Sequence, residues 1–174
     1  MPEGYRNFFF GLLQTGMRFA ELANLTWADV DFQRRLLHVR STESFKTKTS
    51  NSERAIPMTK DLYKLLKQLE PNRKTDLVFT TKSGTQIKER KALSICKAVA
   101  GKAKISSNAF LHKFRHTYAT ILVQRGERLE DIKKLLGHSS ITETEIYAHH
   151  KPDQLHDKVT HLDNLIDLDK KGQS

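Results

Sequence analysis

Apolar residues follow helical spacing along most of this chain and depart from it mainly between residues 30 and 58. The residues around Leu36-Leu37 are typical of a strand and follow turn-forming aspartates. Residues 41–54 are almost entirely polar and precede Ala55-Ile56-Pro57-Met58, so we expect a β-hairpin with its tip around residues 48–53. The sequence therefore predicts a mainly α fold with a small antiparallel three-stranded β-sheet.

The other apolar segments are expected to be helices separated by residues that begin or end helices. Thr59 is a predicted N-cap, and Gly126 and Gly137 stand where helix C-caps belong. The expected helices cover residues 3–14, 17–24, 60–69, 88–100, 109–125, 128–136, 139–149 and 153–168, and residues 77–79 are expected to be extended. With 174 residues, the chain fits one domain, residues 1–150, followed by a C-terminal helix or tail, residues 151–174.

The composition favours a nucleic-acid partner. The net charge is +10 and the isoelectric point is near 9.7. A small basic protein attracts polyanions, because each phosphate contact by Lys or Arg releases condensed counterions. A basic surface can also serve solubility alone, so the charge must be read together with the motifs.

Other features exclude several classes. Cys96 is the only cysteine, so the chain has no internal disulfide and a reducing compartment is expected. The chain has no run of about eighteen apolar residues, the length that a membrane-spanning helix needs. Its N-terminus lacks the features of a signal peptide. We therefore expect a cytoplasmic, nucleoid-associated protein that has no membrane as a partner. His149 and His150 are adjacent but have no second Cys/His pair at zinc-like spacing, so no metal is expected.

The residues that could carry chemistry are weak signals when taken one at a time. In the segment His112-Lys113-Phe114-Arg115-His116, helical spacing puts His112, Arg115 and His116 on one side, which is costly unless an anion lies between them. An exposed basic helix face is the equal alternative. Arg18 and Glu21 form an ordinary i, i+3 pair, and His138 and Tyr147 taken alone would be read as structural residues.

In their order and local sequence, however, these segments resemble the tyrosine recombinase (phage integrase) family. Residues 15–22 resemble its first arginine box, residues 110–120 its His-x-x-Arg-His box, and residues 135–149 its terminal box with the nucleophile. The resemblance runs from about residue 4 to residue 150. It implies the catalytic-domain fold of that family, and the set of boxes in order is far more specific than any one box.

The resemblance also implies the roles of individual residues. The implied catalytic residues are Arg18, Lys48, His112, Arg115, His138 and the nucleophile Tyr147, with Glu21 and His116 in supporting roles. The family keeps its catalytic lysine at a β-hairpin before a strand like Ala55-Ile56-Pro57-Met58. Both Lys46 and Lys48 qualify, and Lys48 is nearer the expected offset from Pro57.

These groups suit phosphodiester chemistry without a metal or another cofactor. Attack on a phosphodiester builds negative charge, which Arg18 and Arg115 would stabilise with planar, permanently charged donors. His112 and His138 would add hydrogen bonds, and Lys48 would protonate the leaving 5′ oxygen. The product would be a 3′-phosphotyrosyl enzyme from which another strand's 5′ hydroxyl displaces Tyr147. The resemblance implies that this chemistry serves site-specific DNA recombination.

Several alternatives remain open at this point. The same chemistry would serve a type IB topoisomerase-like swivelase, and a non-catalytic DNA-binding module derived from a recombinase is a further class. A general RNA-binding protein is less suited, because no aromatic stripe for base stacking is evident.

We expect double-stranded DNA as the partner, with weak, salt-sensitive affinity, because the core-binding domain that precedes the first arginine box in the family is expected to be absent from this chain. A homo-tetramer on DNA is expected for the full-length protein, and a monomer or weak oligomer for this chain. The C-terminal helix would dock either on its own domain or on a neighbouring protomer.

Overall fold

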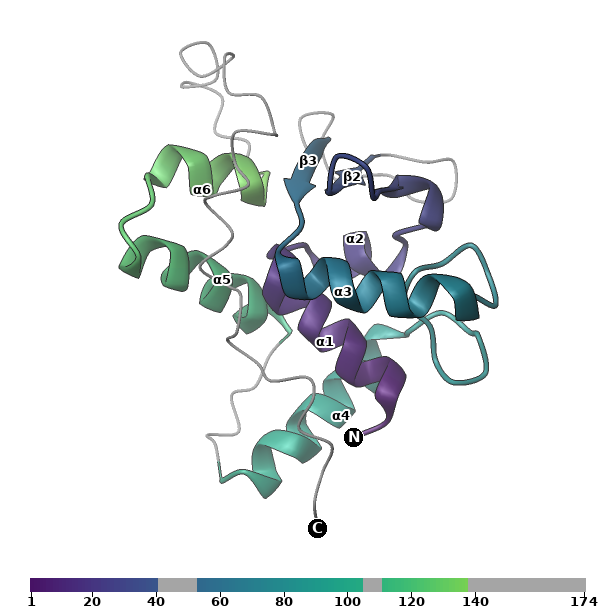
Figure 1. Ribbon diagram of the computed structural model, residues 1–174. Coiled ribbons are helices and arrows are strands. Elements are labelled where there is room, and N and C mark those ends of the chain that lie inside the picture. Colours follow the sequence, from purple (N-terminus) through teal and green to yellow (C-terminus); the bar gives the residue numbers. More distant parts are fainter. Residues whose placement is uncertain (41–52, 105–110, 138–174) are drawn as a thin grey trace.

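The computed structural model describes residues 1–40, 53–104 and 111–137. Its elements are, in order, α1 (Glu3–Thr15), α2 (Phe19–Ala23), η1 (Trp27–Asp29), β1 (Val30–Asp31), β2 (Leu36–Val39), β3 (Arg54–Pro57), α3 (Lys60–Leu69), η3 (Glu70–Asn72), α4 (Glu89–Lys102), α5 (His112–Gln124) and α6 (Leu129–Leu136). Within these ranges, the predicted mainly α architecture with one small antiparallel sheet is confirmed (Figure 1).

Helix α1 runs through the middle of the molecule, with α3 and α5 packed against it (Figure 1). Its Phe8, Phe9, Phe10 and Leu12 are all buried, so this helix meets the core on more than one side. The ring of Phe9 stacks on that of Phe114 with centroids 5.4 Å apart, which fixes the first turns of α5 against α1. This contact holds the start of α5, where His112 and Arg115 lie.

The three strands form a sheet in the order β1-β2-β3, with both pairs antiparallel. In the β2–β3 pair, Leu37 lies opposite Ile56 and Val39 opposite Arg54. Leu37, Val39 and Ile56 are buried in the main core. Since side chains two residues apart on a strand share a face, Arg54 points to the same side as Ile56, toward the interior.

Several helix boundaries agree with the sequence signals, and others do not. Thr59 caps α3 by accepting a hydrogen bond from the Leu62 N–H, and Gly137 ends α6 with left-handed backbone. The sequence predicts that the second helix begins at Met17, but α2 begins at Phe19, because Arg18 has an extended backbone and serves as its N-cap. The helix predicted from residue 109 begins at His112, and residues 105–110 lie outside the described residues.

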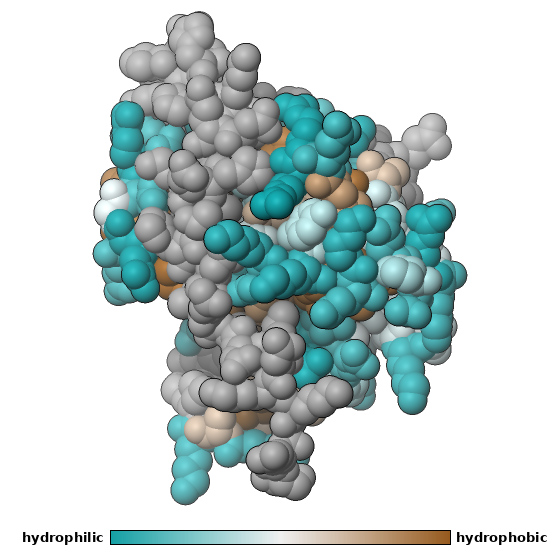
Figure 2. Space-filling model, in the orientation of Figure 1, coloured by the Kyte–Doolittle hydropathy of each residue, from teal (hydrophilic) through white to brown (hydrophobic). Residues whose placement is uncertain are grey.

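The buried side chains form two clusters. The larger one surrounds α1 and includes the sheet and α3, whereas a smaller one joins α5 to α6 through Tyr118, Leu122, Ile132, Leu135 and Leu136. Hydrophilic residues cover most of the described surface on the face that includes α3 (Figure 2). None of the described helices is long and apolar enough to cross a lipid bilayer.

Candidate active site

Three of the predicted catalytic residues meet at one pocket. Arg18, His112 and Arg115 line a cavity of about 330 Å³, although Arg18 lies almost a hundred positions before the other two. Met17, Phe19, Leu93 and Leu111 form its apolar wall, and Glu89, the first residue of α4, adds a carboxylate. The pocket therefore combines two guanidinium groups and an imidazole beside apolar surface.

Arg18 is placed by the break between α1 and α2. Helix α1 ends at Gly16, whose φ of 62° is left-handed, and the chain turns through Met17 to make Arg18 the N-cap of α2. Glu21, three residues after Arg18, accepts a hydrogen bond of 2.8 Å from the Arg18 backbone N–H and one of 2.7 Å from Arg18 Nη1. The Arg18 side chain remains 30% exposed, so the carboxylate orients it while leaving it accessible to a ligand.

Arg115 is almost completely buried and connects the ends of two helices. Its Nη1 donates to the carbonyl oxygen of Gly16 at 2.8 Å, and its Nη2 donates to that of Leu136 at 2.6 Å. Carbonyl groups at the ends of helices lack partners within the helix, and the forked guanidinium binds one at the C-cap of α1 and one in the last residue of α6. Burial, with the nearby charges of Arg18 and Arg54, lowers the pKa of Arg115 to about 10, so this side chain is still charged at neutral pH.

Arg54 is a buried part of the same cluster that the sequence motifs do not identify. Its Nη2 lies 2.9 Å from Glu21 Oε2, its Nη1 lies 3.2 Å from Glu21 Oε1, and its Nε donates to the Leu135 carbonyl oxygen at 2.7 Å. Its side chain is only 7% exposed. The sequence predicts a polar hairpin segment here, but alternation backward from Ile56 would have placed residue 54 on the inward face.

Glu21 is therefore a buried carboxylate between two arginines. Burial alone would raise its pKa, but hydrogen bonds and charge from Arg54, followed by hydrogen bonds from Arg18, outweigh it and lower the pKa to about 2. Glu21 therefore contacts both arginines, and its supporting role stays a prediction. One carboxylate against three guanidinium groups leaves a surplus of positive charge beside the pocket, as a phosphate site needs.

The two histidines of the second box lie near each other but differ in their surroundings. The rings of His112 and His116 are 6.1 Å apart on the exposed side of α5, one turn from each other. His112 lines the pocket with Arg18 and Arg115, whereas His116 is not part of its lining. The catalytic role of His112 and the supporting role of His116 stay predictions.

The remaining predicted site residues lie outside the described residues. These are Lys48 and its alternative Lys46, His138, Tyr147, and the helices expected over residues 139–149 and 153–168. The described chain ends at Gly137, whose carbonyl oxygen is 3.4 Å from Arg18 Nη2. Among the residues that are described, no group of three or more His, Cys, Asp or Glu side chains could hold a metal ion.

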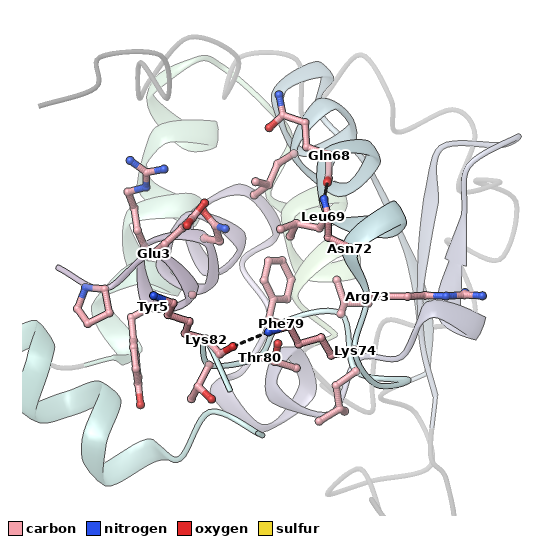
Figure 3. A pocket seen from close by; sticks show the side chains of 18 of the residues that line it. Glu3, Tyr5, Gln68, Leu69, Asn72, Arg73, Lys74, Phe79, Thr80 and Lys82 are labelled. Carbon is pink, nitrogen blue, oxygen red and sulfur yellow. Dashed lines mark hydrogen bonds between the residues drawn. The ribbon is translucent and has the colours of Figure 1, made fainter. Parts of the chain in front are cut away.

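A larger cavity of about 1580 Å³ lies elsewhere, between the start of α1, α3 and residues 72–83 (Figure 3). Glu3, Gln68 and Lys82 are among its lining residues, and Lys74 Nζ donates to the Lys82 carbonyl oxygen at 2.9 Å. None of the three predicted catalytic residues that the structure describes lines this cavity. The smaller pocket is the candidate site, because the arginines and His112 converge there.

Known proteins share this arrangement of sequence and fold. A tyrosine recombinase XerC-like protein of Caldanaerobacter subterraneus subsp. tengcongensis is 32% identical over 87% of this chain and 47% of its own length. Among solved structures, the Tn1549 transposon integrase in complex with transposon right end DNA covers 90% of this chain and 58% of its own, with 26% identity and a TM-score of 0.67. A XerA recombinase covers 92% and 57% respectively, with 26% identity and a TM-score of 0.65.

The chain thus spans about half the length of the curated relatives it matches. The model of the phage integrase family matches residues 3–154, which include every element described above. This chain belongs to the phage integrase family of tyrosine recombinases.

Proposed function

We propose that this chain is the catalytic domain of a site-specific DNA recombinase that acts through a covalent bond to Tyr147. The observation that carries the proposal is the convergence of Arg18, His112 and Arg115 on one pocket from two distant parts of the sequence. The relatives named above are recombinases and integrases, and the Tn1549 integrase structure contains DNA. Double-stranded DNA is therefore the proposed substrate, and a homo-tetramer on DNA is the proposed assembly of the full-length protein.

In the first step, the phenol oxygen of Tyr147 attacks the phosphorus of a phosphodiester. A 3′-phosphotyrosyl bond forms while the bond to the 5′ oxygen breaks. His112 or His138 accepts the phenol proton, and Lys48 donates a proton to the leaving 5′ oxygen. The reverse reaction with the 5′ hydroxyl of another strand then exchanges the strands, so the bond energy is kept in the ester.

The described part of the site contributes charge at the phosphate. Arg18 is accessible and held by Glu21, so its remaining N–H groups can bind a non-bridging oxygen. Arg115 is fixed by two backbone carbonyls and adds positive charge at the base of the pocket. Charges that are already in place need no rearrangement as the transition state forms, which is how such a site lowers the barrier.

Capture of the covalent intermediate tests the proposal. The chain would be incubated with a pool of nicked duplexes of varied sequence, in which the cleaved strand diffuses away and traps the adduct. Tyr147→Phe should abolish the adduct and retain DNA binding. Tyr63→Phe, at a tyrosine on α3 in contact with Arg35, is the matched control and should retain the adduct.

Each outcome bears on the proposal. An adduct that persists in Tyr147→Phe would overturn the assignment of the nucleophile. No adduct with any duplex, by a protein that binds DNA, would favour a non-catalytic DNA-binding module. Relaxation of supercoiled plasmid without strand exchange would favour topoisomerase-like activity.

A further inference from the structure

Arg54 shares the buried carboxylate of Glu21 with Arg18, although it comes from a different element. Glu21 Oε1 receives Arg18 Nη1 at 2.7 Å and Arg54 Nη1 at 3.2 Å. Glu21 Oε2 receives the Arg18 backbone N–H at 2.8 Å and Arg54 Nη2 at 2.9 Å. Both oxygens are thus occupied by two partners each.

This sharing determines how many of the Arg18 hydrogen-bond donors the Glu21 carboxylate uses. A carboxylate facing one guanidinium forms two parallel hydrogen bonds with it, which consumes that arginine's fork. Here Arg54 supplies the paired donors, and the Arg18 guanidinium gives Glu21 a single hydrogen bond, from Nη1. Arg18 is consequently oriented by Glu21 without being neutralised by it.

Arg54 also fixes where α6 ends. Its Nε donates to the Leu135 carbonyl oxygen at 2.7 Å, and a Cβ added to Gly137 would lie 2.8 Å from its Nη1. The end of α6 therefore rests on the Arg54 guanidinium, and the Gly137 carbonyl oxygen lies beside Arg18. One buried side chain of β3 links α2 to the last turn of α6.

We propose that Arg54 is a positioning residue for strand cleavage, acting through Glu21 to keep the Arg18 guanidinium oriented and available for the scissile phosphate. The inference rests on the proposed function, in which Arg18 binds that phosphate. Without Arg54, Glu21 turns to Arg18 and pairs with it through both oxygens. Arg18 then lies away from the phosphate by an ångström or more, a displacement that costs on the order of 10²-fold in rate.

The first test measures the rate constant for covalent adduct formation in a single turnover at saturating DNA, well below the melting temperature. Arg54→Gln should lower this rate constant by about 10- to 100-fold and change DNA affinity little. Arg54→Lys keeps the charge but offers one point donor in place of a fork, so its rate constant should lie between those of wild type and Arg54→Gln. Arg128→Gln, which removes an exposed partner of Glu130, is the matched control and should behave as wild type.

A double variant separates positioning from general damage to the fold. If Arg54 acts through Glu21, Arg54→Gln with Glu21→Gln should be no slower than Glu21→Gln alone. Multiplicative losses would show that Arg54 acts independently and would overturn the inference. A wild-type rate constant in either Arg54 variant would also overturn the inference. If Arg54→Gln does not fold, Arg54→Lys is used for the test in its place.

A second readout needs no activity. In a nitrogen-15 NMR spectrum of the DNA-free chain, the Arg18 side-chain N–H signal would be assigned by its loss in Arg18→Lys. It should shift in Arg54→Gln and stay in place in Arg128→Gln. An unmoved Arg18 signal overturns the inference. A moved signal in a protein that forms no adduct supports the coupling and counts against the proposed function alone.

Discussion

Arg115 donates a hydrogen bond of 2.8 Å to the carbonyl oxygen of Gly16, the residue that ends α1. Arg115 belongs to the His-x-x-Arg-His box, and this bond joins it to the turn within the first arginine box. The turn requires a residue with a left-handed backbone and no side chain, because a Cβ on Gly16 would lie 2.6 Å from the Tyr118 ring. The geometry of the pocket thus depends on a glycine that takes no part in the chemistry.

Gly16→Ala should destabilise the chain by about 2–4 kcal/mol, because left-handed strain adds to the overlap with Tyr118. Denaturant unfolding measures this loss. Gly101→Ala is the control, since Gly101 lies in α4 and a Cβ added there would have nothing within 4 Å of it. This substitution should be neutral or stabilising by up to about 1 kcal/mol. Equal effects of the two substitutions would contradict the packing described at the turn.

Gly137→Ala and Gly126→Ala form a second pair. Both glycines have left-handed backbone, with φ of 66° and 82°, but only at Gly137 would a Cβ meet another group, the Arg54 guanidinium. Gly126→Ala should cost roughly 1–2 kcal/mol of folding free energy. Gly137→Ala should cost about 1 kcal/mol more and should also slow adduct formation. Denaturant unfolding and single-turnover cleavage check the two parts, and identical behaviour of the pair would contradict them.

Tyr118→Phe should leave stability unchanged or raise it by up to about 1 kcal/mol. The Tyr118 hydroxyl is fully buried and has no hydrogen-bond partner among the described residues, so its removal ends a desolvation cost. Burial also raises the pKa of this phenol, which keeps the group neutral. Thermal melting tests the expectation, and a loss above about 1 kcal/mol would mean that the hydroxyl does have a partner.

Glu21 predicts a specific dependence of stability on pH. Its pKa is about 2 in the folded chain, against an ordinary value of 4.5. The folded state therefore holds the ionised form more strongly, which gives stability that is complete above about pH 4.5 and is lost as the pH falls toward 2. A shift of this size corresponds to about 3 kcal/mol.

Glu21→Gln should remove that part of the acid sensitivity. Denaturant unfolding at pH values from about 6 to about 2.5 would show a smaller loss of stability than in wild type. Glu130→Gln, which alters an exposed partner of Arg128, should keep the wild-type slope. If wild type and Glu21→Gln lost stability in parallel, the ion pairs around Glu21 would not contribute as described.

Much of the fold could be predicted because local signals determine it. Thr59 and Gly137 mark helix ends through their own backbone and side-chain chemistry, and the helical spacing of the apolar residues in α1 predicts a buried helix. Arg18 shows the limit of such signals. Its neighbours have helical spacing, yet the preceding Gly16 turn leaves it extended, and the hydrogen bond to Glu21 stabilises that conformation.

The site was harder to predict, because its geometry comes from contacts between distant elements. The boxes identify Arg18, His112 and Arg115 by sequence, but the pocket that unites them exists only after the start of α2 has packed with α4 and α5. Arg54 carries no motif, and only strand alternation from Ile56 indicates its inward face, whereas its contact with Glu21 depends on how the sheet packs against α2. Glu89 carries no motif and reaches the pocket only through the placement of α4.

The separation of the two apolar clusters has a consequence for breathing motions of the native state. Helix α6 packs with α5 in its own small cluster, and Arg54 and Arg115 hold its last turn to the rest of the molecule. Helix α6 can therefore detach without melting the cluster around α1, at a free energy below that of global unfolding. Amide protons of α6 should accordingly exchange with solvent deuterium earlier than those of α1. The hydrogen bonds from Arg54 and Arg115 contribute to the free energy needed to open α6.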